Sequence, residues 1–318
     1  MRIAAIDIGT VTSRLLVADV NAAGVQTVLR RSTITDLGVG VDATGRLAAE
    51  AIERTVDAVG SYKKLIDECD AQTPVDRVTA LATSASRDAE NADEFVGRLH
   101  AVGVDLSVIP GNREAELSFL GASNDFRGEN LLFADIGGGS TELALGRADA
   151  PAGALVPEVS MRSFRSFNVG CRRMTERFLH GDPPSDAEYA EARAWAAEEL
   201  APFFADVDLH VDRLVAVAGT PTSVVAVRDA LVPYDSSKVH KALVSRQQFD
   251  GVRTRLSRMA LADRMQVPGI QPKRAGVFPA GALILDAVMD LAGVEAFTAS
   301  ESDILMGIVL DAACGSAE

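Results

Sequence analysis

Cysteine, histidine and long apolar runs are scarce in this sequence of 318 residues, and each shortage argues against a class of protein. The three cysteines, Cys69, Cys171 and Cys314, stand singly without a CxxC pair, which argues against a disulfide scaffold and a zinc site. The four histidines are isolated, so no histidine metal motif is visible. No apolar run reaches ~18 residues and the chain enters a strand directly, so we expect neither a membrane span nor a signal peptide. A cytoplasmic protein fits these features.

Positive charge is also in short supply. The chain has 31 Lys and Arg against 45 Asp and Glu, which gives a net charge of −14. Such a chain repels polyanions at long range, which argues against a general nucleic-acid binder. A phosphate ligand must then be held locally, by backbone amides, a few arginines and a divalent cation. The length and the 47% of hydrophobic residues predict two domain cores of ordinary size.

The sequence is organised around residues 131–145, LLFADIGGGSTELAL. An apolar run followed by glycines and a second apolar run predicts two antiparallel strands joined by a glycine hairpin. Asp135 ends the first strand, where its carboxylate can hold a magnesium ion or its waters, and Glu142 begins the return strand. The tip offers backbone N–H groups and a hydroxyl to a phosphate, from Gly137, Gly138, Gly139 and Ser140. A plain glycine hairpin without a ligand has the same pattern.

A second copy of this pattern stands at residues 3–17, IAAIDIGTVTSRLLV. Aligning Asp7 with Asp135 also pairs glycine with glycine and one hydroxyl residue with another. A strand, Asp-Ile-Gly and hydroxyl unit that recurs half a chain later indicates a duplicated domain, with a phosphate-binding hairpin from each half. The alignment sets Arg14 against Glu142, so one hairpin carries a cation where the other carries a carboxylate.

Each half is predicted to follow the order βββαβαβα, with insertions in the second half. In the first half, Asn91 is expected to cap a helix, and the polar stretch 124–128 marks the seam between the halves. In the second half, Thr220 is expected to cap a helix that begins with proline. The remaining helices of that half are expected at about 172–178, 186–204, 246–264, 279–291 and 302–313.

These motifs resemble the exopolyphosphatase and guanosine pentaphosphate phosphatase family (Ppx/GppA), within the superfamily of actin, sugar kinases and heat-shock chaperones. The resemblance covers essentially the whole chain. Its strongest matches are residues 7–15, 135–142, 82–87 with Asn91, and 109–115. Softer matches are residues 168–170 with Arg173, residues 218–220, and Arg274 with residues 279–281.

The resemblance implies an α/β fold of two duplicated ribonuclease-H-like domains, as in actin-like ATPases, with the active site in the cleft between them. The domains are expected at 1–124 and 125–299, with a C-terminal helix at about 300–318 packing back on the first. The histidine-aspartate domain of longer relatives has no counterpart, so the short form is expected. The chain departs from the family pattern at Thr10, Val11, Pro110 and Arg113.

The resemblance also assigns roles to site residues. Glu114 falls on the position of the family's catalytic glutamate, and we expect Glu142 to assist it. Without the resemblance, a glutamate in the first turn of a helix is explained by the helix dipole. Mg²⁺, or Mn²⁺, is expected on Asp7 and Asp135. Besides the second hairpin, the expected phosphate ligands are Thr10, Thr12, Arg14, Thr83 and Arg87.

Three functions remain open from the sequence. The first is an exopolyphosphatase that releases orthophosphate, preferentially from short inorganic polyphosphate. The second is a 5′-phosphohydrolase of guanosine pentaphosphate (pppGpp), and the third is a non-catalytic phosphate or nucleotide sensor. Val11 favours the sensor, whereas the carboxylates of Glu114 and Glu142 favour an enzyme. We expect a cytoplasmic homodimer that binds neither nucleic acid nor membrane.

Overall fold

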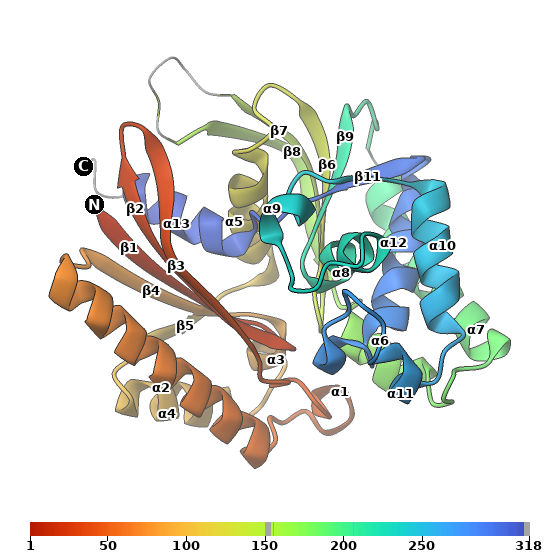
Figure 1. Cartoon of the computed structure of the whole chain (residues 1–318), viewed down its shortest axis with the longest axis horizontal. Helices are drawn as coiled ribbons and strands as arrows, with labels where there is room; N and C mark the ends of the chain where they lie inside the picture. Colours follow the sequence, from red (N-terminus) through yellow and green to blue (C-terminus); the bar gives the residue numbers. More distant parts are fainter. Residues whose placement is uncertain (150–153, 155, 206, 315–318) are drawn as a thin grey trace. The chain divides into compact units, whose positions relative to one another are not determined.

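The computed structural model describes residues 1–149, 154, 156–205 and 207–314. The chain divides into two compact units (Figure 1). The first comprises Met1–Gly128, Ala148–Ser160 and Ile304–Glu318, and the second comprises Glu129–Arg147 and Met161–Asp303. No helix in the described part of the chain combines the length and apolar character needed to cross a membrane.

The first unit is built on a five-stranded sheet with the strand order β3-β2-β1-β4-β5. Strand β1 pairs antiparallel with β2 and parallel with β4, because a tight hairpin follows β1 whereas a helix separates β3 from β4. The strands are β1 (Arg2–Ile8), β2 (Thr12–Asn21), β3 (Gly24–Ile34), β4 (Arg77–Ala82) and β5 (Leu106–Val108).

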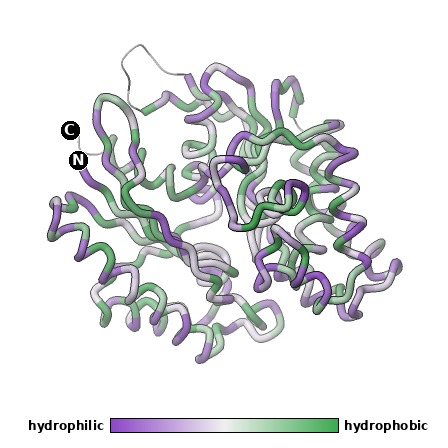
Figure 2. The backbone as a smooth tube through the Cα atoms, in the orientation of Figure 1, coloured by the Kyte–Doolittle hydropathy of each residue, from purple (hydrophilic) through white to green (hydrophobic). Residues whose placement is uncertain are grey.

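Helices cover both faces of this sheet (Figure 1). The side chains of β1 alternate: Ala4, Ile6 and Ile8 join a core with α2 and α4, while Ile3 and Ala5 join a second core with α5 and α13. Figure 2 shows α2 alternating between hydrophilic and hydrophobic residues, as expected for a helix with one buried face. The helices are α1 (Val41–Thr44), α2 (Ala49–Gln72), α3 (Ser84–Arg87), α4 (Ala92–Ala101), α5 (Gly111–Ser123) and α13 (Ile304–Cys314).

The second unit repeats this topology and adds one strand. Its six-stranded sheet has the order β8-β7-β6-β9-β11-β10, in which the first five positions correspond to the five strands of the first unit. The predicted duplication is therefore confirmed by strand order as well as by sequence. The strands are β6 (Asn130–Ile136), β7 (Thr141–Asp149), β8 (Glu158–Phe167), β9 (Arg213–Val217), β10 (Leu243–Ser245) and β11 (Ala296–Ala299).

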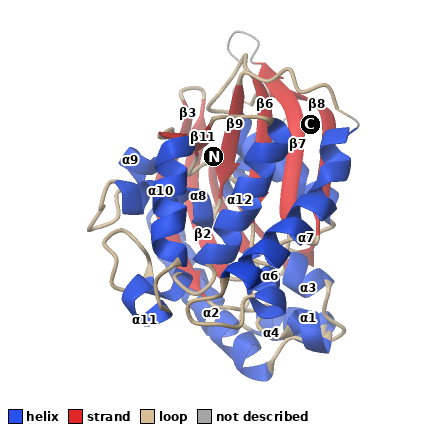
Figure 3. Ribbon diagram, turned by 90° about the vertical axis from the view of Figure 1, so that its right-hand side faces the viewer, coloured by secondary structure: helices blue, strands red, loops and turns tan. Residues whose placement is uncertain are grey.

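The helices of the second unit flank its sheet (Figure 3). The expected helix over 246–264 is interrupted after Ser257, so it forms α10 and the short α11. At α10, Ser245 and Gln248 form a reciprocal capping box, which fixes where that helix begins. The elements are α6 (Cys171–Phe178), α7 (Asp186–Ala205), α8 (Gly219–Arg228), α9 (Ser236–Val239), α10 (Arg246–Ser257), α11 (Leu261–Arg264), the 3₁₀ turn η1 (Pro272–Arg274) and α12 (Phe278–Ala292).

Two expected helix caps differ in the structure. Ala218, not Thr220, occupies the N-cap position of α8, since the helix already begins at Gly219. Asn91 does occupy the N-cap position of α4, but its side chain makes no capping bond. Its amide instead exchanges two hydrogen bonds with the backbone of Leu47, at 2.8 and 3.1 Å. The Asn91 side chain, which the sequence predicts to cap the helix, is used for a tertiary contact instead.

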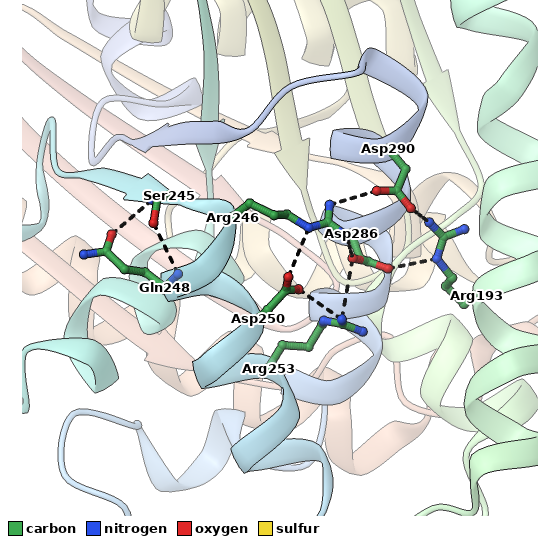
Figure 4. A network of polar contacts seen from close by, with 8 residues as sticks. All are labelled: Arg193, Ser245, Arg246, Gln248, Asp250, Arg253, Asp286 and Asp290. Atoms are coloured by element: carbon green, nitrogen blue, oxygen red, sulfur yellow. Dashed lines mark hydrogen bonds and ion pairs between the residues drawn. The ribbon is translucent and has the colours of Figure 1, made fainter.

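A network of three arginines and three aspartates ties α7, α10 and α12 together (Figure 4). Asp286 is its buried centre, because its carboxylate lies 2.8 Å from Arg193 Nε and 2.6 Å from Arg246 Nη2. Arg253 lies 3.9 Å from the same carboxylate and 3.0 Å from Asp250. A buried carboxylate needs such partners, since an unpaired charge in the interior is costly.

Candidate phosphate-binding and catalytic residues

In the first unit, Asp7 lies at the end of β1 directly opposite Arg14 on β2. Both Nε and Nη2 of Arg14 donate to the same carboxylate oxygen of Asp7, at 3.0 and 2.6 Å. The Asp7 side chain is 4% exposed and that of Arg14 is 17% exposed. The expected metal ligand and the expected phosphate ligand are thus already held against each other.

The hairpin between these strands is closed by its own backbone. Gly9 N–H donates to the Thr12 carbonyl at 3.0 Å. The loop after β3 packs on the tip, where Gly38 N–H donates to the Thr10 carbonyl at 2.9 Å. The Thr10 side chain is buried, whereas Thr12 is half-buried at the start of β2.

Glu114 lies in the first turn of α5 and is held by two of the other expected site residues. Arg87 Nη1 donates to Glu114 Oε2 at 2.7 Å and to the Ile109 carbonyl at 3.0 Å. The Thr83 hydroxyl also bonds to the Glu114 carboxylate. Thr83 and Arg87 follow β4, and Glu114 follows β5, so all three lie at the carboxyl edge of the sheet with Asp7. That edge is where open α/β sheets bind ligands.

The groups around Glu114 have opposing effects on the pKa of its carboxyl group. Burial raises the pKa of the Glu114 carboxyl above its ordinary value, and the negative charge of Asp7 acts in the same direction. The Arg87 guanidinium and the Thr83 hydroxyl lower that pKa, because they stabilise the charged form. Burial is the largest of these effects, so the pKa remains raised. A buried carboxylate with a raised pKa, at the edge of the sheet where ligands bind, is suited to accept a proton from water.

In the second unit, Asp135 is the last residue but one of β6 and lies directly opposite Glu142 on β7, as Asp7 in β1 lies opposite Arg14. The sequence alignment therefore also holds in strand register. Glu142 is 1% exposed, and its Oε1 accepts a hydrogen bond of 2.7 Å from the Ser166 hydroxyl. Gly137 N–H closes this hairpin on the Ser140 carbonyl at 3.0 Å. Gly137, Gly138, Gly139 and Ser140 form its tip.

The carboxylates fit a hard divalent cation. Asp135 and Glu142 are buried cross-strand neighbours, and Asp7 is a buried carboxylate at the equivalent position of the other hairpin. Among the described residues, no group of three or more His, Cys, Asp or Glu forms a complete metal cage. Mg²⁺ usually keeps several waters and takes one or two carboxylates together with substrate phosphates, so the carboxylates of either hairpin, taken alone, are of a kind that suits it.

Two contacts at the hairpins could not be seen in the sequence. Ser166 comes from β8 and reaches Glu142 across the sheet, although nothing local distinguishes this serine from its neighbours. The loop at residues 35–38 reaches Thr10 and Val11 from the far end of β3. Away from the hairpins, Arg87 pairs with Glu114, which lies 27 residues later in the chain.

Comparison with known proteins matches residues 16–313 to the Ppx/GppA phosphatase family. The chain belongs to this family. Exopolyphosphatase 2 of Mycobacterium tuberculosis is 38% identical to it over 329 aligned residues, covering 98% of each chain. Among solved structures, an exopolyphosphatase-like protein is 36% identical with a TM-score of 0.90, covering 100% of this chain and 99% of that one. The Ppx/GppA family member of Aquifex aeolicus is 30% identical with a TM-score of 0.81, with the same coverage.

The structure shows the surroundings of three residues that depart from the Ppx/GppA pattern. Val11 is 8% exposed, and its carbonyl accepts N–H groups from Thr35 and Asp36 at 3.0 and 2.9 Å. Pro110 stands at the N-cap of α5, where a missing N–H costs little. Arg113 pairs with Glu116 on its own helix and with Asp311 on α13, at 3.2 and 2.7 Å.

Proposed function

We propose that this member of the Ppx/GppA family is an exopolyphosphatase, which hydrolyses the terminal phosphoanhydride bond of inorganic polyphosphate and releases orthophosphate. The observation that carries the proposal is the setting of Glu114. It is a buried carboxylate held by Arg87 and Thr83, at the same sheet edge as a hairpin suited to phosphate. Similarity to M. tuberculosis exopolyphosphatase 2 over nearly the whole chain supports the same activity.

The chain's own residues supply what phosphoanhydride hydrolysis needs. A water attacks the terminal phosphorus, the P–O bond to the bridging oxygen breaks, and the shortened chain leaves with that oxygen. Glu114 orients the water and accepts its proton, and Glu142 assists as a second carboxylate. Arg14 and Arg87 neutralise the non-bridging oxygens, helped by hairpin amides and the hydroxyls of the other expected ligands.

We further propose Mg²⁺, or Mn²⁺, as the cofactor, with Asp7 and Asp135 holding it directly or through its waters. The buried carboxylate donors described above support this choice. When bound, the ion would neutralise charge on the transferring phosphoryl group. Arg14 would orient Asp7, since its Nε and Nη2 both bind one oxygen of that carboxylate.

Orthophosphate release from short polyphosphate, with Mg²⁺ or with a chelator, tests the proposal. We expect release that depends on the ion and falls at least ~10²-fold in Glu114→Gln, because the variant removes the base but keeps side-chain volume. Glu116→Gln is the matched control on the same helix, since Glu116 faces Arg113 rather than Arg87. Absence of release by the folded wild type, or Glu114→Gln activity within a few-fold of it, would contradict the proposal.

The same residues suit the terminal phosphate of pppGpp, and membership of a family named for both activities supports this alternative. Assaying pppGpp beside short polyphosphate would separate the two substrates by kcat/KM. We also propose a cytoplasmic location, supported by three cysteines that form no disulfide within the described residues. The expected homodimer stays a prediction, which light scattering of the purified chain would check.

A further inference from the structure

We propose that each phosphate hairpin is held in its working shape by a separate buttress that binds its carbonyl groups, and that Gly38, Gly170 and Arg173 are the positioning residues. The hairpin of the first unit is buttressed by the loop at residues 35–38. The hairpin of the second unit is buttressed by the start of α6. This inference rests on the proposed function only for the ligand that the hairpins receive.

The second-unit buttress is a helix start and a guanidinium. Cys171 N–H donates to the Gly137 carbonyl at 2.9 Å. The N–H groups of Arg172 and Arg173 donate to the Gly138 carbonyl at 2.8 and 3.2 Å. Arg173 Nε then donates to the Gly139 carbonyl at 3.0 Å. Three successive carbonyls of the glycine tip are therefore bound by α6.

The first-unit buttress binds two of the three equivalent carbonyls, through backbone N–H groups of a loop. Thr10 occupies the position of Gly138, and its carbonyl accepts from Gly38 N–H at 2.9 Å. Val11 occupies the position of Gly139, and its carbonyl accepts from two successive N–H groups of the same loop, at 3.0 and 2.9 Å. In both hairpins, carbonyl groups of the tip accept hydrogen bonds from N–H groups of another segment. We call this shared arrangement the hydrogen-bonding polarity of the hairpins. The donor segments share neither sequence nor secondary structure.

This polarity has a consequence for anion binding. In a planar trans peptide, the carbonyl of one residue and the N–H of the next point in opposite directions. A carbonyl held by the buttress therefore aims the following N–H away from it. The N–H groups that follow the held carbonyls include those of Val11, Gly138, Gly139 and Ser140, and none of these four donates a hydrogen bond found within the described residues. Each buttress leaves its hairpin with amides available to an anion.

Both buttresses approach so closely that they require glycine. A Cβ on Gly170 would lie 2.3 Å from the Gly138 carbonyl oxygen and 2.4 Å from two backbone carbons of the tip. A Cβ on Gly38 would lie 2.2 Å from Cγ2 of Thr10. Neither glycine has a positive φ, so the requirement is one of space and not of backbone conformation. A side chain at position 170 would meet backbone and push the hairpin out of place, whereas one at position 38 would first displace the buried Thr10 side chain at the tip.

Hydrogen exchange of the unliganded protein tests the second buttress directly. The readout is exchange at the N–H groups of Gly137, Cys171 and Arg172, which make its bonds and the hairpin closure. We expect Arg173→Met to speed exchange there by about tenfold, as for loss of one bond from a charged donor. Arg173→Lys should recover part of the protection. Arg177→Met removes the same charge from the same helix, where Arg177 stacks on Trp195, and should leave these amides unchanged.

Glycine variants extend the test to both units. Gly170→Ala and Gly38→Ala should each speed exchange at their own hairpin, with the melting temperature still showing a folded protein. Gly251→Ala and Gly97→Ala are matched controls, because a Cβ at either position meets nothing within 4 Å. If Gly170→Ala fails to fold, the two Arg173 variants still decide the second buttress.

Hydrolysis gives the second readout. Arg173→Met should lower kcat/KM for short polyphosphate by about tenfold relative to Arg177→Met, with partial rescue by Arg173→Lys. Unchanged exchange in Arg173→Met, or faster exchange with unchanged kcat/KM, would overturn the buttress. If the wild type releases no orthophosphate, the proposed function fails, while exchange alone still supports or overturns the buttress.

Discussion

Arg87 and Glu114 form a hydrogen-bonded ion pair of 2.7 Å in which the arginine serves two groups at once. The same Nη1 also donates to the Ile109 carbonyl, which precedes the helix that carries Glu114. The arginine therefore fixes both the carboxylate and the chain segment that presents it. A residue expected to bind substrate phosphate is thereby also placed to control the ionisation of the expected base.

Arg87→Met should shift the acid limb of the kcat/KM profile to higher pH. Burial raises the pKa of Glu114 and Arg87 opposes that rise, so removing the cation leaves burial less opposed. The base must be ionised to accept a proton, so activity is then lost first at the acid end. The measurement is polyphosphate hydrolysis against pH. Arg98→Met, at an exposed site of the same unit, is the control. An acid limb that does not move in Arg87→Met would show that Arg87 does not affect the ionisation of Glu114.

Asp286→Asn should destabilise the second unit by about 3 kcal/mol. The substitution leaves the half-buried Arg193 and Arg246 facing a neutral amide at a buried position, and breaking a buried ion pair typically costs ~3–5 kcal/mol. Asp290→Asn lies one turn later on α12 and removes the same charge, but its side chain is 49% exposed against 5% for Asp286. Urea unfolding of the two variants should therefore give a clearly larger loss for Asp286, and equal losses would mean that burial is not the deciding factor.

Gly307→Ala should weaken the attachment of α13 to α5. A Cβ at Gly307 would lie 1.8 Å from the Leu117 carbonyl oxygen and 2.6 Å from its carbonyl carbon. Overpacking of this kind costs ~1–3 kcal/mol, because backbone cannot rotate aside as a side chain can. Thermal unfolding should show the loss, and Gly97→Ala should not. Retained stability would show that the two helices can slide apart without cost.

Short polyphosphates should be preferred over long ones. The chain carries a net charge of −14, so each phosphate beyond the bound terminus meets a repulsive field on average. The check is kcat/KM for chains of a few phosphates against very long chains, at low and moderate salt. Long chains held by a basic track would be faster at low salt and would weaken steeply as salt rises. That result would reveal cationic contacts that the overall charge conceals.

The sequence alone determined the duplicated architecture. Two Asp-Ile-Gly hairpins, each between apolar runs, specify local β-strand pairing, and local pairing survives into the structure because hairpin register is set by the turn itself. Asp7 opposite Arg14 and Asp135 opposite Glu142 follow from that register. Helix starts were less predictable. Asn91 and Thr220 had the right residue types for caps, but backbone from elsewhere competed for one, and the other lies inside a helix that begins earlier.

The tertiary structure decided which groups face the site residues. Arg87 comes from the end of β4 to Glu114, Ser166 comes from β8 to Glu142, and residues 35–38 come from beyond β3 to the first hairpin. Such contacts depend on which strands become neighbours in the sheet. The residue types around each position in the sequence do not indicate them. The sequence therefore determined the hairpins and their carboxylates, because both are encoded within a few adjacent residues. Only the fold decided how those groups are held, since their partners lie on other strands and helices.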